Sequence, residues 1–135
     1  MVEYRINRIL IIESNTHFRN TLKNFLQSQF PTVAFEEVQN GAEALQKATY
    51  FCPDIIFMGI KLSTEAAVIN RKIKNLFPKV TIVFFSDYDS NEYRDAAKES
   101  GADYILQKGV STAEEIEGLV HSILNSTRSS RIKGS

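Results

Sequence analysis

The sequence predicts an α/β fold in which helices cover both faces of a parallel central sheet. Short apolar runs of strand length alternate five times with segments whose apolar residues recur at helical spacing. Several runs, such as residues 9–12, are continuously apolar, which is typical of strands buried on both faces. Strict alternation of the two kinds of segment favours right-handed crossovers between parallel strands. At 135 residues, the chain has the length of one domain with its own core.

The first strand is predicted over residues 9–12, because four aliphatic residues in a row are too few for a helix. A helix is predicted over residues 16–29, ending before Pro31, because proline disfavours helical geometry in the residue before it. Residues 33–38 alternate weakly and predict an outer strand. The helix carries an apolar stripe formed by Phe18, Leu22, Phe25 and Leu26.

Asn40 and Glu43 have the spacing of a helix cap, so a short second helix is expected to begin there. Residues 55–58 form the third predicted strand, and a third helix follows and ends at Pro78. The second helix is predicted to bury a stripe formed by Ala44, Leu45 and Ala48, and the spacing of Ile69, Ile73, Leu76 and Phe77 marks the third helix.

The last third of the chain repeats the pattern twice. A fourth strand is predicted over residues 80–85, and the helix that opens at residues 89–92 is stopped by Gly101. A fifth strand covers residues 104–106, and residues 111–114 form a capping box for the last helix. That helix presents one apolar face, formed by Ile116, Leu119, Val120, Ile123 and Leu124.

Composition narrows the classes of function. Sixteen basic and sixteen acidic residues leave no net charge, which removes the simplest argument for nucleic acid or an anionic membrane as a partner. The single cysteine, Cys52, cannot form an internal disulfide and is expected to be a small buried residue in a reducing compartment. No membrane-spanning run or signal peptide is recognised, so a cytoplasmic location is expected. Residues 1–127 are predicted to form the domain, and residues 128–135 a linker stub, a flexible tail or an artificial end.

Polar or small residues follow the predicted strands at their carboxyl ends. These residues are Glu13 and Ser14 after the first strand, Gly59 after the third, Ser86 after the fourth and Lys108 after the fifth. Open parallel sheets place ligand sites at this edge, so the five residues are expected to lie together.

The sequence also resembles a known family. The resemblance is to the receiver domain of bacterial two-component response regulators, over residues 7–126. It rests on five segments in the expected order, Ile9-Leu10-Ile11-Ile12-Glu13-Ser14, Pro53-Asp54-Ile55-Ile56-Phe57-Met58-Gly59, Ile82-Val83-Phe84-Phe85-Ser86, Ala96-Ala97-Lys98-Glu99-Ser100-Gly101-Ala102-Asp103 and Lys108. The resemblance implies a three-layer α/β/α sandwich of the flavodoxin-like type, with a five-stranded parallel sheet in the order 2-1-3-4-5, and a role in phosphorelay signal transduction.

The chain departs from the family where the chemistry takes place. In the family, two acidic residues after the first strand hold magnesium, and an aspartate after the third strand accepts the phosphoryl group. Here Ser14 takes the second acidic position and Gly59 the phosphoacceptor position, which leaves Glu13 as the one remaining carboxylate. Magnesium binding is therefore expected to be weak or absent, with no other cofactor. Ile105 takes the position of the family's switch aromatic, so that coupling is also expected to be lost.

No other carboxylate can substitute for the missing one. Asp54 lies at the opposite end of the same predicted strand, about 16 Å away at the rise of an extended chain. Asp87 follows Ser86, but adjacent residues of an extended chain point to opposite sides. Phosphorylation of the usual kind is therefore not expected, and Glu13 and Lys108 are predicted to form a structural ion pair in a vestigial pocket.

Two hypotheses of function follow. The first is a pseudo-receiver module that acts through contact with a partner protein or a second copy of itself. It would use the last two helices and the fifth strand, as the family commonly does. The alternative is a ligand-gated pseudo-receiver that binds a small anion or metabolite near Lys108. An enzyme is improbable, because the first strand is followed by no glycine-rich phosphate loop and no catalytic triad is recognised. Nucleic-acid binding by this domain is also not expected, since no recognition helix is present.

Overall fold

The computed structural model describes residues 6–61, 63–87 and 90–133. Five strands and five helices alternate along the chain. Their order is β1 (Arg8–Ile12), α1 (Thr16–Gln29), β2 (Ala34–Val38), α2 (Gly41–Phe51), β3 (Ile55–Met58), α3 (Thr64–Leu76), β4 (Thr81–Ser86), α4 (Asn91–Glu99), β5 (Tyr104–Gln107) and α5 (Ala113–Lys133).

The five strands form one parallel sheet in the order β2-β1-β3-β4-β5, which confirms the predicted fold class and strand order. The pairing register aligns Ile12 with Met58, and Met58 with Phe84. As a result, the residues that follow β1 and β3 emerge side by side at one edge of the sheet.

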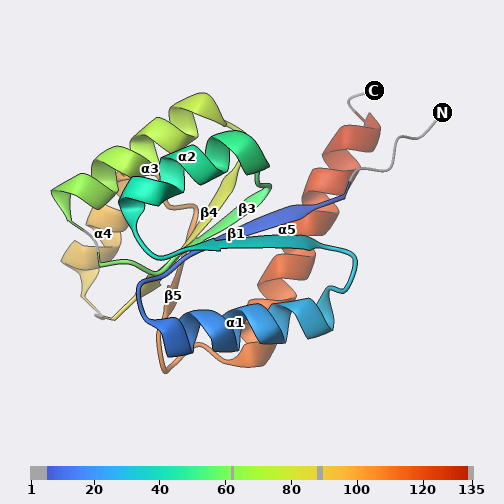
Figure 1. The fold of residues 1–135 in the computed structure, drawn as a ribbon, viewed down its shortest axis with the longest axis horizontal. Coiled ribbons are helices and arrows are strands. Elements are labelled where there is room, and N and C mark those ends of the chain that lie inside the picture. The colour runs from blue at the N-terminus through green and yellow to red at the C-terminus, as the bar shows by residue number, and fades with distance from the viewer. Residues whose placement is uncertain (1–5, 62, 88–89, 134–135) are drawn as a thin grey trace.

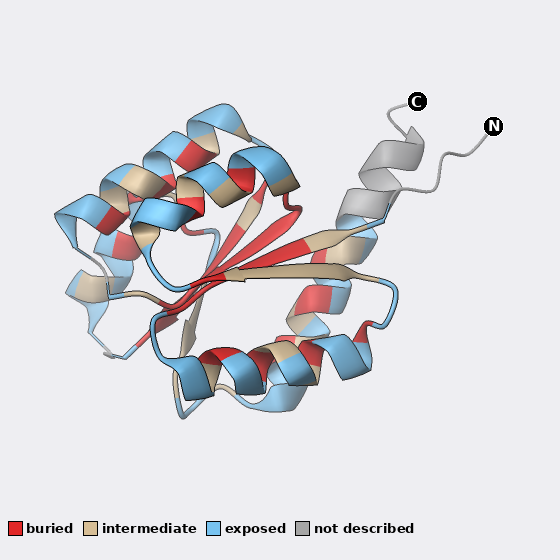
Figure 2. Cartoon of the chain, viewed as in Figure 1, coloured by how far each residue is buried: buried red, intermediate tan, exposed pale blue. Residues whose placement is uncertain are grey.

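Two layers of helices cover the sheet, as Figure 1 shows, with α1 and α5 on one face and α2, α3 and α4 on the other. Successive residues of a strand point to opposite faces, so each strand contributes to both cores. Leu10 and Ile56 pack with the α2–α3–α4 layer, whereas Ile9 and Phe57 pack with α1 and α5. The three central strands are almost wholly buried, as the red strands of Figure 2 show.

Of the two helix caps predicted from the sequence, one is confirmed. The Asn40 side chain accepts a hydrogen bond from the backbone N–H of Glu43 at 3.0 Å, as the capping pattern predicted. The cap of α5 was placed one residue too early. Thr112 caps the helix, its hydroxyl accepting from the N–H of Glu115, whereas the Ser111 hydroxyl accepts from the N–H of Gln107 and closes the preceding turn.

Two other expectations differ from the structure. Cys52 is exposed rather than buried, and it lies at the C-cap of α2 in the left-handed conformation with φ 51°. The helix α5 continues to Lys133, through most of the segment 128–135 that was expected to lack structure. The end of the domain at residue 127 stays a prediction.

The chain enters and leaves the sheet at the edge opposite to the strand ends that carry Glu13 and Gly59. The strand β1 begins at this edge, and α5 runs back toward it. The start of β1 and the end of α5 lie on the same side of the molecule in Figure 1.

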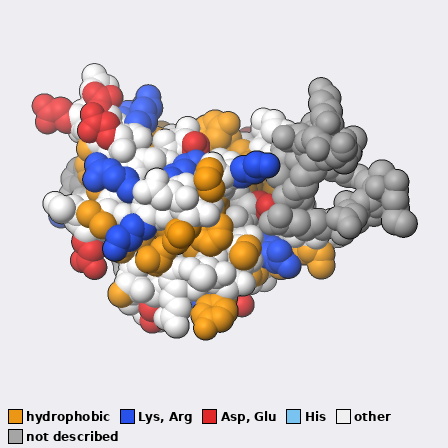
Figure 3. Space-filling view, turned by 90° about the horizontal axis from the view of Figure 1, so that it is seen from above, with side chains coloured by type: hydrophobic (Ala, Val, Ile, Leu, Met, Phe, Trp, Pro, Cys, Tyr) orange, Lys and Arg blue, Asp and Glu red, His pale blue; other side chains and the backbone are white. Residues whose placement is uncertain are grey.

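The outer face of the α2–α3 layer is mixed in character. Figure 3 shows basic side chains interspersed with apolar ones on this face. Exposed apolar residues on these two helices include Tyr50, Val68 and Leu76. In the described part of the chain, no helix is both long enough and apolar enough to cross a membrane.

Burial predicts how two leucines differ in their effect on stability. We expect Leu26→Ala, in the core between α1 and the sheet, to lower the free energy of unfolding by about 2–5 kcal/mol, because it leaves a cavity. Leu76→Ala is the matched control, and since Leu76 is 59% exposed the change should be within about 0.5 kcal/mol. Urea unfolding followed by circular dichroism measures both, and equal losses would contradict this assignment of the core.

Candidate functional site

The carboxyl ends of β1, β3 and β5 converge on the ammonium group of Lys108. Its Nζ lies 2.5 Å from Oε1 of Glu13 and donates to the carbonyl oxygen of Gly59 at 3.1 Å. The same ammonium lies 4.9 Å from the ring centroid of Phe18, in cation–π contact. The ion pair between Glu13 and Lys108 predicted from the sequence is present, and the three residues enclose the cation.

Glu13 is held as tightly as a core residue, although its side chain is charged. Its relative exposure is 2%. The second carboxylate oxygen, Oε2, accepts from the backbone N–H of Asn15 at 2.9 Å, and the backbone carbonyl of Glu13 accepts from Nη1 of the buried Arg19 at 2.8 Å. Asn15 in turn caps α1 through its side chain, which accepts from the N–H of Phe18. Glu13 is therefore fixed by the loop that starts α1 as well as by Lys108.

Gly59 lies against this carboxylate. Its N–H donates to the carbonyl of Ile12 at 2.7 Å, which keeps β1 and β3 paired beyond the last strand residues. A Cβ atom at Gly59 would lie 2.4 Å from Oε1 and 3.0 Å from Cδ of Glu13. In this conformation the Glu13 carboxylate occupies the space of a Cβ at residue 59, so a side chain at this position requires the carboxylate to shift.

Phe18 belongs to this site, although its spacing in the sequence indicated only the apolar stripe of a helix. It was assigned to core packing, which is partly right, because its ring meets that of Phe85 edge to face at 5.2 Å. Phe85 in turn stacks on Phe57 at 5.7 Å, so the ring that contacts Lys108 is the first of three aromatic rings packed in sequence. Only the position of Phe18 in the first turn of α1, directly after the β1 loop, hinted at this role.

The other predicted site residues are placed less centrally. Ser86 is 1% exposed at the end of β4, and its backbone carbonyl accepts from the N–H of Lys108 at 2.9 Å. Ser14 is exposed, so the structure does not bring its hydroxyl into the group around Lys108 as a buried partner. Ile105 is partly buried against the core on the α4 side, whereas Tyr104, one residue earlier, is 44% exposed. After Lys108, Gly109 turns the chain with φ 78°, a left-handed conformation that suits glycine.

The carboxylates that were considered as substitutes lie elsewhere. Asp54 precedes β3, at the opposite end of the strand, and its Oδ2 accepts from the backbone N–H of Arg8 at 2.8 Å. Asp87 is exposed directly after β4. Asp54 therefore fixes the start of β1 rather than taking part in the strand-end site, as its position in the sequence indicated.

The residues at the strand ends do not suit a magnesium ion. A receiver-type magnesium site needs several oxygen ligands, with carboxylates among them. Glu13 supplies the single carboxylate of the group, and both of its oxygens are engaged, one by Lys108 and one by Asn15. Within the described ranges, no group of three His, Cys, Asp or Glu residues is arranged to hold a metal ion.

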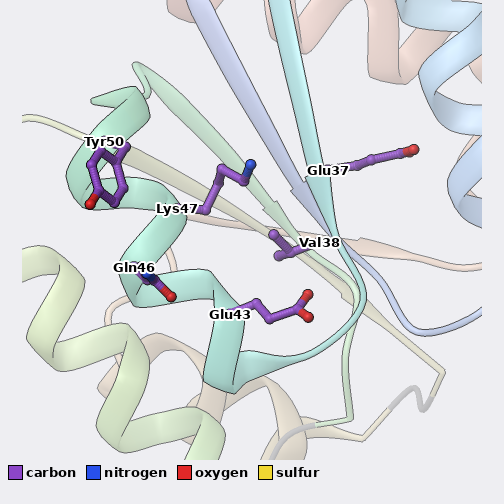
Figure 4. Close-up of a pocket in the computed structure, with 6 residues that line it drawn as sticks. All are labelled: Glu37, Val38, Glu43, Gln46, Lys47 and Tyr50. Atoms are coloured by element: carbon purple, nitrogen blue, oxygen red, sulfur yellow. The ribbon is translucent and has the colours of Figure 1, made fainter.

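A separate surface depression lies along β2 and α2. It is lined by Glu37, Val38, Glu43, Gln46, Lys47 and Tyr50, and Figure 4 shows Glu37 turned away from α2. Lys47 pairs with Glu36 at 3.5 Å, and Glu37 lies 3.5 Å from Arg19 and 3.6 Å from Lys23 on α1. None of the strand-end residues described above lines it. Its charged groups are used to fix the edge strand between its two neighbouring helices.

The contact between Gly59 and Glu13 predicts an unusual cost for a small substitution. We expect Gly59→Ala to lower the free energy of unfolding by about 1–3 kcal/mol, because the methyl group must displace the Glu13 carboxylate. Gly118→Ala is the control, since a Cβ there meets nothing within 4 Å and alanine favours the helix by up to about 1 kcal/mol.

Chemical denaturation of both variants measures the difference. In a Glu13→Ala background the loss caused by Gly59→Ala should shrink, because the obstructing carboxylate is gone. A Gly59→Ala protein as stable as the parent would show that the carboxylate does not fill this space.

Comparison with known proteins agrees with the fold. The sequence pattern of the family described as "Response regulator receiver domain" matches residues 9–120. Response regulator protein VraR of Staphylococcus saprophyticus is 24% identical over 115 residues, which are 83% of this chain and 54% of VraR. Chemotaxis protein CheY of Halobacterium salinarum is 24% identical over 102 residues, which are 75% of this chain and 83% of CheY. The chain thus spans about half the length of VraR.

Solved structures are similar over nearly the whole chain. A two-component response regulator from Clostridium difficile has a TM-score of 0.78 at 28% identity, covering 88% of this chain and 96% of that one. The signal receiver domain of an HD domain-containing protein from Pseudomonas fluorescens has a TM-score of 0.80 at 18% identity, covering 93% and 99%. With the family pattern covering most of the sequence and the same fold in these structures, the chain belongs to the response regulator receiver domain family.

Proposed function

We propose that this chain is an atypical receiver domain of phosphorelay-type signal transduction, which lacks the phosphoacceptor aspartate and acts through phosphorylation-independent protein–protein contact. The observation that carries the proposal is the packing at Gly59, where the Glu13 carboxylate fills the space of a side chain. Covalent phosphorylation requires a positioned nucleophile, and a glycine provides none. The vestigial pocket is assigned to Glu13, Ser14, Gly59, Ser86 and Lys108.

Receiver domains in general are non-enzymatic signalling domains, and we propose the same for this one. The contacts of Lys108 support a structural role for the ammonium group, because an ion pair, a backbone carbonyl and an aromatic ring already surround it. They count against the alternative of a metabolite bound beside Lys108, since the cation has an internal counter-charge. Ile105 supports the loss of switching, because an aliphatic side chain at this position has no ring to rotate.

The partner surface is proposed to lie on α4, β5 and α5. β5 is an edge strand of the sheet, and Tyr104 on it and Val110 after it are exposed apolar residues, at 44% and 64%. Acidic residues outnumber basic ones from residue 87 to residue 117, which favours a partner, or a second copy, that presents basic groups there. We place this function in the cytoplasm, with no role for nucleic acid or a membrane.

The proposal predicts that acetyl phosphate does not label the protein. Intact-mass spectrometry after incubation with acetyl phosphate and Mg²⁺ should show no added phosphoryl group, because no carboxylate lies at the end of β3. A receiver domain that carries the aspartate serves as the positive control. Stoichiometric, hydroxylamine-sensitive labelling of this chain would contradict the proposal.

Magnesium should have little effect on the parent protein. Millimolar Mg²⁺ is expected to leave the thermal unfolding midpoint unchanged, since a ligand raises the midpoint only if it binds the native state. The Ser14→Asp/Gly59→Asp variant supplies two further carboxylates at the strand ends and should become sensitive to Mg²⁺. Sensitivity of the parent equal to that of the variant would show that Glu13 and its neighbours hold the ion without added acids.

A further inference from the structure

The donors at the strand ends are those of an anion-binding site, and a side chain of the protein itself already occupies them. We infer that the Glu13 carboxylate is the resident anion of this site, and that a small oxyanion can bind Lys108 only after that carboxylate is removed. This inference rests on the proposed function, because it explains what occupies the reaction centre of a receiver domain that carries no phosphoryl group.

The donors around the carboxylate are those that would bind a free anion. The Lys108 ammonium lies 2.5 Å from Oε1, and the Asn15 N–H donates to Oε2 at 2.9 Å. Asn15 is the N-cap of α1, so this N–H belongs to the positive end of a 14-residue helix. The two oxygens of one carboxylate are thus held by two independent cationic features, as the oxygens of a bound phosphate or acetate would be.

Burial makes the internal counter-charge necessary. The side chain of Lys108 is 18% exposed, and that of Glu13 is 2% exposed. A charge removed from water to this degree is strongly destabilising unless an opposite charge compensates it. Without an acidic side chain at position 59, Glu13 is the residue of the group that can neutralise Lys108.

Gly59 makes the arrangement possible. The carboxylate reaches Lys108 by passing through the space that a Cβ at residue 59 would need, at 2.4 Å from Oε1. Glycine and the inward carboxylate therefore depend on each other. An entering phosphate would meet the negative charge and the volume of Glu13 together, so the parent protein excludes it.

The test uses inorganic phosphate as the probe and the whole chain in four forms. These are the parent, Glu13→Ala, Glu13→Gln and the double variant Glu13→Ala/Lys108→Met. Thermal unfolding is measured in increasing phosphate, against chloride at equal ionic strength. Glu13→Ala should show a midpoint that rises with the logarithm of the phosphate concentration, because removal of the carboxylate leaves the donors free and the space open.

The other forms separate charge from space. The parent should show no specific rise, and Glu13→Gln at most a small one, because its amide still fills the pocket. The double variant should lose the response of Glu13→Ala, since the cation is gone. Acetate should also stabilise Glu13→Ala, because it restores the missing carboxylate. A parent that responds to phosphate as strongly as Glu13→Ala, or a response that survives Lys108→Met, would overturn the inference.

If the Glu13→Ala protein folds poorly, a second measurement tests the inference. A double-mutant cycle with Glu13→Gln and Lys108→Met should show at least a tenfold favourable coupling in the unfolding equilibrium constant, and additive effects would overturn the inference. Failure here is distinct from failure of the proposed function, which is tested by acyl-phosphate formation on the parent. A protein that takes no phosphoryl group and yet binds phosphate beside Glu13 would refute the internal anion alone.

Discussion

The strand-end edge of this domain depends on the ion pair between Glu13 and Lys108. Lys108 follows the edge strand β5, and Glu13 follows β1 in the middle of the sheet, so their contact spans the ends of β3 and β4. The carbonyl of Gly59 and the ring of Phe18 complete the surroundings of the ammonium group. One partly buried cation therefore links the central strands, the edge strand and the first turn of α1.

The ion pair with Glu13 explains how Lys108 is stabilised without a carboxylate at residue 59. Loss of a carboxylate beside a buried lysine would normally leave the lysine uncompensated, at a considerable cost in stability. Here Glu13, at the end of β1, supplies the negative charge. The absence of a side chain at residue 59 leaves room for its carboxylate. The domain keeps the fold of its family. In the function that we propose, its strand ends serve packing and charge balance.

Much of the fold follows from the sequence, because its signals are local. Continuous aliphatic runs such as residues 9–12 define buried strands, and Asn40 marks a helix start that the structure retains. The sequence was ambiguous where two neighbouring residues were equally suited to the same role, such as capping a helix. Ser111 and Thr112 both precede a glutamate at the right spacing, and only the turn after β5 decides that Thr112 caps the helix. The residue type of Cys52 favoured burial, but its place at the C-cap of α2 leaves it exposed.

The strand-end site was also predictable from the sequence only in part. The convergence of Glu13, Gly59 and Lys108 follows from the rule that parallel strands end at one edge, so the sequence was sufficient to predict it. The role of Phe18 and the exclusion between Gly59 and the carboxylate depend on rotamers and on distances of a few ångströms, which no spacing in the sequence encodes.

The course of the backbone at the far edge has a consequence for assembly. Because β1 starts and α5 finishes at the edge remote from Lys108, a domain joined before β1 or after α5 would be attached on that side. Such a tether leaves the loops around Glu13 and Gly109 unobstructed by the fusion itself. In such a fusion, a binding partner has access to the carboxyl ends of the strands, while the fused domain is attached at the opposite edge of the sheet.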